Sequence, residues 1–236
     1  SLLLAKVIVL NDGKSDPSIS LSSEAPFAEG GHRLCYQHPA CPHLCIKVNR
    51  PGWDHQLWQR APFFRRLLRP VSSFNDNWME FKAFQQFAIR QNQPEVLRHI
   101  PQCYGWIHTD LGPGLVTNFF ADKNGMPCET LATYLHRCGL DETILAAVAE
   151  FRDFMRRYRV ITKNLLPHNL LVMADERGAL RLVLIDGFGS LSLFPNHLFP
   201  PLSRRYVEKR LRLMDLRIRW EVSDKRVTWE ETEAKG

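Results

Sequence analysis

An amide and a carboxylate stand at corresponding ends of two short apolar runs between residues 160 and 189. Asn169 comes directly before the run 170–172, and Asp186 directly follows the run 180–185. The polar turn ADERGA between the runs predicts a β-hairpin, whose paired strands would bring both side chains to one edge. Amide and carboxylate oxygens suit Mg²⁺, which usually completes its shell with water and nucleotide phosphates. The alternative is an ordinary hairpin with a polar residue at each end.

Three residue types earlier in the chain could contribute to a phosphate site. Gly30 and Gly31 predict a turn between strands that lets a ligand phosphate approach the backbone, although a plain turn has the same sequence. Lys47 lies in the apolar run CIKV, where an inward-facing lysine would be costly without a counter-charge. Glu80 falls on the first turn of a helix that begins near Asn77. The alternatives are an outward-facing lysine and a solvent-exposed glutamate.

A segment rich in histidine and cysteine occupies residues 35–45. Cys41, His43 and Cys45 alternate and could therefore line one face of a strand, where zinc would accept them as ligands. Neither a C-x-x-C nor an H-x-x-x-H spacing occurs in this segment. Small side chains packed in a sheet are the alternative interpretation.

Composition limits the classes of protein to which this chain can belong. Its 236 residues, 44% apolar and 24% charged, fit one compact unit or two small lobes that share a cleft. No apolar run approaches about 18 residues, so we expect no membrane-spanning segment. Six cysteines are too few for a disulfide scaffold, and the opening SLLLAKVIVL lacks the basic region of a signal peptide, so we expect a cytoplasmic protein with reduced thiols. The net charge of +6 favours anionic partners.

Strand signals precede helix signals along the chain. The patterns predict strands at 33–37, 44–48, 100–104, 105–109 and 115–120, and helices after residue 77 and at 130–138, 140–158 and 203–220. The tail that follows is expected to be disordered at its end. This order predicts an α+β fold, with a five-stranded antiparallel sheet followed by a helix-rich part that contains the hairpin.

Several segments, in this order, resemble the YrbL-type family, bacterial proteins named for the PhoP regulatory network and built on a kinase-like fold. The segments are GGHRLCYQHP, CIKV, a helix carrying Glu80, ADKNGMP, LLPHNLLV and IDGFG. The resemblance implies a protein-kinase-like two-lobed fold with ATP and Mg²⁺ between the lobes. Residues 1–21 would be an N-terminal extension, 22–117 an N-lobe with a basic aromatic insertion at 50–77, and 118–236 a small, truncated helical C-lobe.

The resemblance also implies a role for each candidate residue. Gly30 and Gly31 would cover the nucleotide phosphates, and Lys47 would contact them while Glu80 braces the lysine. The hairpin residues Asn169 and Asp186 would bind the metal ion.

Two departures from the protein-kinase pattern H-R-D-x-x-x-x-N concern catalysis. Asn164 takes the place of the proton-accepting Asp, and an amide cannot accept that proton. Leu166 takes the place of a lysine that neutralises phosphate charge. His168 could act as a substitute base, or it could be an exposed turn histidine without a role. A general base contributes about 10²–10⁴-fold, whereas positioning and electrostatics dominate phosphoryl transfer, so a slow enzyme is compatible with these departures.

Three functions are compatible with these features. The first is an ATP-dependent phosphotransferase for a small-molecule or lipopolysaccharide- or glycolipid-type acceptor, since no Ala-Pro-Glu segment follows residue 189 to support a protein substrate. The second is a pseudokinase-like regulatory module that binds nucleotide without turnover. The third is a basic membrane-surface or nucleic-acid binder, although no motif that reads specific nucleic acid occurs.

Two basic segments, 50–77 and 203–220, are candidates for contact with an anionic membrane surface or an acidic protein partner. Such contact would place a cytoplasmic protein peripherally at the inner membrane.

Overall fold

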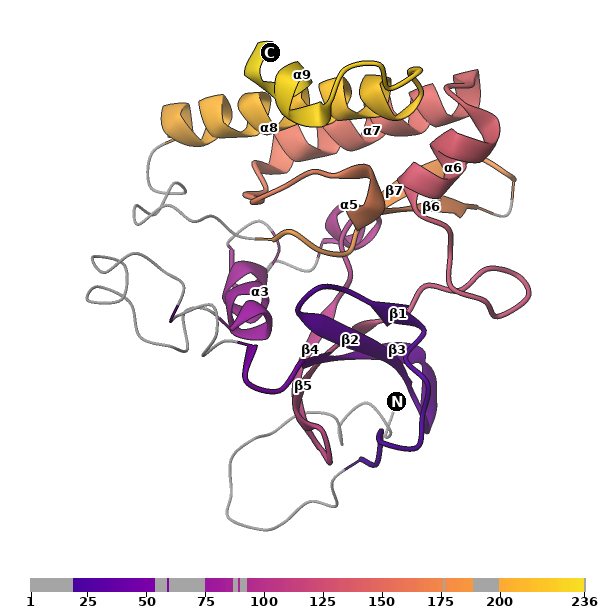
Figure 1. The fold of residues 1–236 in the computed structure, drawn as a ribbon, viewed down its shortest axis with the longest axis vertical. Coiled ribbons are helices and arrows are strands. Elements are labelled where there is room, and N and C mark those ends of the chain that lie inside the picture. The colour runs from indigo at the N-terminus through magenta and orange to yellow at the C-terminus, as the bar shows by residue number, and fades with distance from the viewer. Residues whose placement is uncertain are drawn as a thin grey trace. The chain divides into compact units, whose positions relative to one another are not determined.

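The computed structural model describes residues 19–53, 59, 75–86, 89, 93–175, 177–188 and 200–235. These residues form two compact units (Figure 1). The first unit holds the described residues up to Lys82 together with Gln102–Ala121, and the second holds those of Ala83–Pro101 and of the chain after Ala121. Residues 1–18, and all of the predicted insertion 50–77 except 50–53, 59 and 75–77, lie outside the described part.

The first unit is built on a five-stranded antiparallel sheet in the order β1-β2-β3-β5-β4. Its strands are β1 (Ala28–Glu29), β2 (Arg33–His38), β3 (Cys41–Asn49), β4 (Cys103–Thr109) and β5 (Gly112–Asn118). The central strand β3 is buried from Leu44 to Val48, as expected for a strand that is covered on both faces. Gly114 on β5 is required for this packing, because a Cβ there would collide with the Cγ2 methyl group of Ile46.

One strand prediction was wrong. The segments 100–104 and 105–109 were expected to be separate strands, whereas β4 is a single strand that starts at Cys103. Its register with β5 shifts between Cys103 and Gly105, and Gly105 has a φ of 97°. Gly105 therefore forms a bulge inside a single strand, at the place where the sequence predicted a break between two strands.

The first described residues are part of this unit. Ile19 forms a parallel bridge with Thr109, and Leu21 is fully buried against the sheet. The carboxylate of Asp110 accepts hydrogen bonds from the backbone N–H of Leu21 (2.7 Å) and of Ser22 (3.2 Å). Residues 19–21, which we had assigned to an N-terminal extension, are thus fastened to the turn between β4 and β5.

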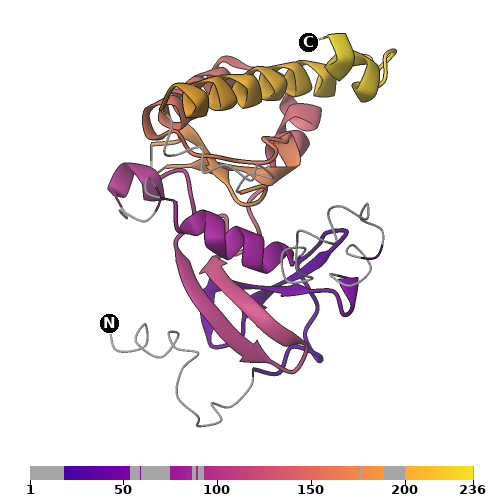
Figure 2. The ribbon, with the colours of Figure 1, turned by 90° about the vertical axis from the view of Figure 1, so that its left-hand side faces the viewer.

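Helix α3 (Asp76–Phe84) packs beside the sheet (Figure 2). It begins where the Asn75 side chain accepts a hydrogen bond from the backbone N–H of Trp78 at 2.9 Å, the arrangement of an N-cap. A short helix, α5 (Pro94–Leu97), follows in the second unit and has no counterpart in our sequence prediction.

The second unit joins one hairpin to four longer helices. Its elements are α6 (Leu131–Cys138), α7 (Glu142–Tyr158), a 3-10 turn at Pro167–Asn169, β6 (Leu170–Ala174), β7 (Leu180–Leu184), α8 (Pro200–Glu221) and α9 (Trp229–Lys235). Helix α7 begins at its N-cap Asp141, which accepts from the backbone N–H of Ile144, and ends at Arg159 in the left-handed conformation. Its predicted apolar face is buried, as is that of α8, which consists of Val207, Leu211, Met214 and Ile218.

The predicted disorder of the tail is corrected by α9. The Thr228 hydroxyl accepts from the Glu231 N–H, and the Glu231 carboxylate accepts from the Thr228 N–H, which is a capping box. Trp229 then packs edge-on against Trp220 of α8. These contacts hold in a helix a segment that was expected to be disordered at its end.

The predicted fold class is confirmed. The protein is α+β, and its element order, a five-stranded antiparallel sheet with one helix followed by a helix-rich unit with a polar hairpin, is that of a protein-kinase-like fold. In the part of the chain that the structure describes, no helix is long and apolar enough to cross a membrane.

Candidate nucleotide and metal site

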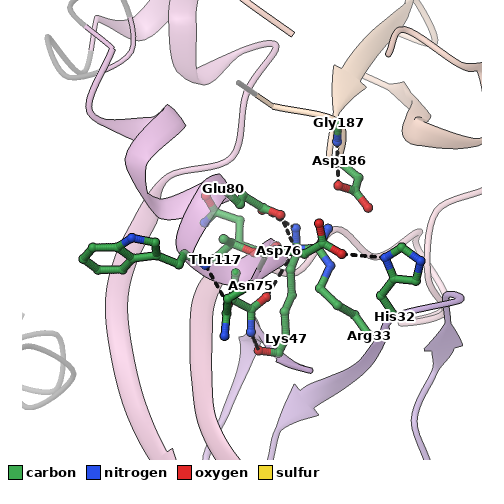
Figure 3. A network of polar contacts seen from close by, with 12 residues as sticks. His32, Arg33, Lys47, Asn75, Asp76, Glu80, Thr117, Asp186 and Gly187 are labelled. Atoms are coloured by element: carbon green, nitrogen blue, oxygen red, sulfur yellow. Dashed lines mark hydrogen bonds and ion pairs between the residues drawn. The ribbon is translucent and has the colours of Figure 1, made fainter. Parts of the chain in front are cut away.

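Lys47 and Glu80 form a buried ion pair inside the first unit. The Lys47 ammonium, on β3, lies 2.6 Å from Glu80 Oε1 on α3, and their side chains are 8% and 3% exposed (Figure 3). The central position of β3 makes Lys47 face inward, and α3 brings the carboxylate that a buried ammonium needs. The alternative of an outward-facing lysine and a solvent-exposed glutamate is therefore wrong.

Arg33 is a second buried cation on the same carboxylate. Its guanidinium donates to Glu80 Oε2 and, over 3.3 Å, to Asn77 Oδ1, while Asn77 Nδ2 donates to the backbone carbonyl of Lys47 at 2.7 Å (Figure 3). Glu80 is consequently held from two strands at once. Sequence reasoning missed Arg33, because it stands at the first position of a strand that also contains polar residues, and its sequence context gives no signal of burial.

The first turn of α3 has an additional attachment to the sheet. His32 Nδ1 lies 2.7 Å from Asp76 Oδ2, and the His32 ring packs against Trp53 with centroids 4.6 Å apart. Helix α3 is thus bound to the β2–β3 pair through Asp76, Asn77 and Glu80, which lie on its first two turns.

Gly30 and Gly31 form the exposed turn before β2. The Gly30 N–H donates to the Arg33 carbonyl at 2.9 Å, which closes the turn. A Cβ on Gly30 would meet nothing closer than 3.7 Å, and one on Gly31 nothing within 4 Å. Neither glycine has a positive φ, so the fold itself does not require glycine at either position.

Two cysteines near this ion pair, Cys35 and Cys45, share a hydrogen bond between their thiols. A hydrogen bond with Cys45, helped by the positive charges of Lys47 and Arg33, lowers the pKa of Cys35 to about 7, while the same hydrogen bond and burial raise the pKa of Cys45. Among the described residues, no group of three or more His, Cys, Asp or Glu side chains could hold a metal ion. The zinc interpretation of 35–45 has no ligand set there, and His38 Nδ1 instead accepts from the backbone N–H groups of residues 40 and 41.

The predicted hairpin is present in the second unit. Strands β6 and β7 pair from Leu170 with Leu184 to Ala174 with Leu180, and the Ile185 N–H donates to the Asn169 carbonyl at 2.9 Å. Asn169 thus stands opposite Ile185, one residue before Asp186. The predicted hairpin is therefore present, with Asn169 and Asp186 near the same end of the strand pair.

Gly187 lies in close contact with Asn164, Asn169 and Asp186. It has a φ of 79°, and its N–H donates to Asp186 Oδ1 at 2.5 Å. A Cβ at this position would lie 2.5 Å from the Asn164 carbonyl oxygen and 3.2 Å from Asn169 Nδ2. The structure therefore brings Asn164, Asn169, Asp186 and Gly187 into one tight cluster, and only glycine fits at its centre.

The two residues considered for proton transfer are accessible. Asn164 and His168 are both exposed, on either side of the buried Leu165 and Pro167. Asn164 contributes its backbone carbonyl to the Gly187 cluster, which leaves its side-chain amide exposed to solvent.

The donor set of this cluster fits Mg²⁺. Asn169 offers an amide oxygen and Asp186 a carboxylate, both hard oxygen ligands, and a site with so few protein ligands is the kind that Mg²⁺ fills with water and phosphate oxygens. The turn that carries them is fixed by Gly187 and by the Lys163 N–H, which donates to the Gly187 carbonyl at 2.7 Å. The roles of these residues, and of Gly30, Gly31, Lys47 and Glu80, remain predictions.

Comparisons with known proteins find relatives in sequence and similar solved structures. YrbL from Escherichia coli (strain K12) is 27% identical over 184 residues, which cover 75% of this chain and 76% of the relative. YrbL from Shigella flexneri matches to the same extent.

Two solved structures are similar at lower levels. The PknI kinase domain of Mycobacterium tuberculosis, a double mutant, is 17% identical with a TM-score of 0.44, covering 79% of this chain and 66% of that one. Rad53 in complex with AMP-PNP is 10% identical with a TM-score of 0.49, covering 89% of this chain and 52% of that one. Neither likeness is high enough to assign an activity.

The family described as "PhoP regulatory network protein YrbL" matches residues 19–218, a range that includes every candidate residue of both units. The chain belongs to this family.

Proposed function

We propose that the protein is an ATP- and Mg²⁺-dependent phosphotransferase whose acceptor is a small molecule or a glycolipid of the lipopolysaccharide type. The observation that carries the proposal is the buried Lys47–Glu80 ion pair. Burying charges is costly, and a surface or apolar pair would hold the same helix to the sheet at less cost, so an inward ammonium suggests a role with an anionic ligand.

In this proposal the first unit binds the phosphates. Lys47 donates to phosphate oxygens, and Glu80 and Arg33 hold its position. The Glu80 carboxylate is bound by both Lys47 and Arg33, so it cannot rotate freely. The open space around Gly30 and Gly31 supports their proposed role, since no side chain there keeps a phosphate away from the backbone of the turn. The Gly30 N–H already donates to the Arg33 carbonyl, so the proposed role of Gly30 is close approach and not donation.

The hairpin of the second unit provides the metal ligands. Asn169 and Asp186 would hold Mg²⁺, which neutralises developing charge on the phosphates when bound. Gly187 keeps the carboxylate oriented through the hydrogen bond to its N–H. Positioning and charge stabilisation of this kind supply most of the rate in phosphoryl transfer.

Among the described residues, the site has no carboxylate in the position of a general base that would take the proton from the acceptor. Asn164 cannot take the acceptor proton, and the exposed His168 imidazole is the nearest group in sequence that can. We therefore expect turnover slower by about 10²–10⁴-fold than with a well-placed carboxylate base.

The acceptor class rests on the connection after the hairpin. Only residues 187–199 separate Asp186 from α8. A segment this short gives little chain for a platform that would hold an extended peptide, which favours a compact acceptor.

A catalytically silent nucleotide-binding module is the second candidate, and Asn164 is the observation that favours it. Both candidates predict that Mg·ATP raises the melting temperature of the wild type and that Asp186→Ala and Lys47→Met abolish this shift. Asp153→Ala and Lys209→Met are the matched controls, because both side chains are exposed and lie on α7 and α8, outside the segments that carry the candidate residues.

Turnover separates the two candidates. Transfer of labelled phosphate from ATP to small hydroxyl compounds or glycolipid acceptors, lost in Asp186→Ala, would support the phosphotransferase. Binding with equal background hydrolysis in wild type and Asp186→Ala would support the silent module, and absence of any nucleotide effect would refute both.

A further inference from the structure

We propose that the outer face of α8 is a docking surface for an anionic membrane. Four cations define this cationic stripe: Arg205, Lys209, Arg212 and Arg219. At 3.6 residues per turn they fall within an arc of about 80° and extend over about 21 Å of helix. All four are exposed, and the opposite face of the helix is the buried one. Helix α8 runs along the outside of its unit (Figure 2).

The three carboxylates of α8 are engaged by cations outside the stripe. Glu208 Oε1 lies 2.8 Å from Arg156 Nε, and Asp215 Oδ2 lies 2.7 Å from Arg152 Nη1. Glu221, at the end of α8, accepts from Arg217 over 3.1 Å. Within the ranges that the structure describes, the four stripe cations form no ion pair. The stripe therefore keeps a net positive potential toward solvent, although Asp215 also attracts Arg219.

The same ion pairs show how the positive surface extends beyond α8. Arg152 of α7 pairs with Asp215 of α8, whereas Arg156, one turn further along α7, pairs with Glu208, which comes earlier in α8. The two helices are therefore antiparallel. The exposed Arg157, near the C-terminal end of α7, consequently lies at the same end of the pair as the N-terminal half of the stripe. Exposed cations from two helices thus gather at this end.

The apolar side chains on this face favour lipid over nucleic acid. Leu202 is 48% exposed, and Leu216, which is partly exposed, lies at helical spacing between Arg212 and Arg219. A leucine between cations can enter the headgroup region of a bilayer, but it gains nothing against a phosphodiester backbone. The aromatic residue nearest in sequence to Arg219, Trp220, is occupied by Arg217 and Trp229 and offers no free ring for a base.

The size of the effect follows from the number of cations. A Lys or Arg near an anionic leaflet changes the affinity by about fivefold, so two substitutions should weaken binding by about 25-fold. Binding should also weaken as salt rises, because the Debye length falls to about 8 Å at physiological ionic strength.

The test is co-sedimentation of the full chain with vesicles of phosphatidylglycerol and phosphatidylethanolamine, without nucleotide or Mg²⁺. The variants are Arg205→Gln/Lys209→Gln and Arg212→Gln/Arg219→Gln. The control, Lys123→Gln/Arg177→Gln, removes the same net charge from exposed positions outside the helix pair. Circular dichroism verifies that each variant is folded.

We expect wild type and control to bind these vesicles alike, both stripe variants to lose about 25-fold, and none to bind phosphatidylcholine vesicles. Failure of the wild type to bind, or an equal loss in the control, would overturn the proposal. So would tighter binding to duplex DNA than to vesicles at the same salt, lost in the stripe variants, because it would identify the stripe as a nucleic-acid surface. Since ATP is left out, none of these results bears on the proposed phosphotransferase.

Discussion

Replacing Gly187 by alanine should damage the hairpin β6–β7 and its polar cluster far more than the same change at Gly178. The two glycines have nearly equal φ angles, 79° and 81°, and both belong to the second unit. They differ in their surroundings. A Cβ at Gly187 would lie 2.5 Å from the Asn164 carbonyl oxygen, whereas one at Gly178 has no atom within 4 Å.

The expected cost separates into two parts. A left-handed backbone costs a residue with a Cβ about 1–2 kcal/mol, which applies to both positions. Overpacking adds about 1–3 kcal/mol at Gly187 alone, because the clashing oxygen belongs to the backbone and cannot rotate away. We therefore expect losses of about 1–2 kcal/mol for Gly178→Ala and about 2–5 kcal/mol for Gly187→Ala in the free energy of unfolding.

Urea unfolding of wild type and both variants, followed by far-UV circular dichroism, measures this difference. Mg·ATP binding by the folded variants gives a second readout, which Gly187→Ala should weaken and Gly178→Ala should leave intact. Equal destabilisation by the two substitutions would refute the packing argument. Intact Mg·ATP binding in a folded Gly187→Ala protein would refute the link between this cluster and the metal.

Three further predictions concern charges in the two units. Glu80→Gln removes the carboxylate that neutralises Lys47 and should lower the free energy of unfolding by about 3–5 kcal/mol, measured by urea titration. Burial lowers the pKa of His99 below its ordinary 6.5, so the unfolded state takes up the proton first and stability should fall as pH drops below 6.5. Urea midpoints on both sides of that pH check this, and His99→Phe should flatten the dependence. The Cys35 thiol, with a pKa of about 7, should react with iodoacetamide between pH 7 and 11, whereas burial raises the pKa of Cys103 to about 11 and should protect it; site-resolved mass spectrometry distinguishes the two.

The ion pair and the hairpin were predicted on different grounds. The apolar run around Lys47 indicated only that an inward-facing lysine needs a counter-charge, and the resemblance to kinase-like folds named Glu80 as its partner. The hairpin register follows from two apolar runs and a turn of fixed length, which also fixes where Asn169 stands.

The features that sequence reasoning missed depend on tertiary contacts. Arg33 looks like any strand cation until α3 brings Glu80 and Asn77 to it. The bulge at Gly105 is determined by pairing with β5, and a single strand sequence does not reveal it. Helix α9 was missed for a different reason: the capping box at Thr228 and Glu231 is visible in the sequence, but terminal segments are commonly disordered and this one was expected to be so.

The way the chain alternates between the two units has a consequence for its synthesis. Residues 102–121 return to the first unit after the preceding segment has joined the second. Because β5 pairs with β3, a nascent chain that has not yet reached Asn118 presents β3 as an open edge, with unpaired backbone groups beside Lys47. A truncated product ending before this point would expose a strand that invites intermolecular pairing. Fragments for expression should therefore extend past Asn118, since a fragment that ends earlier lacks part or all of β5, the partner of β3.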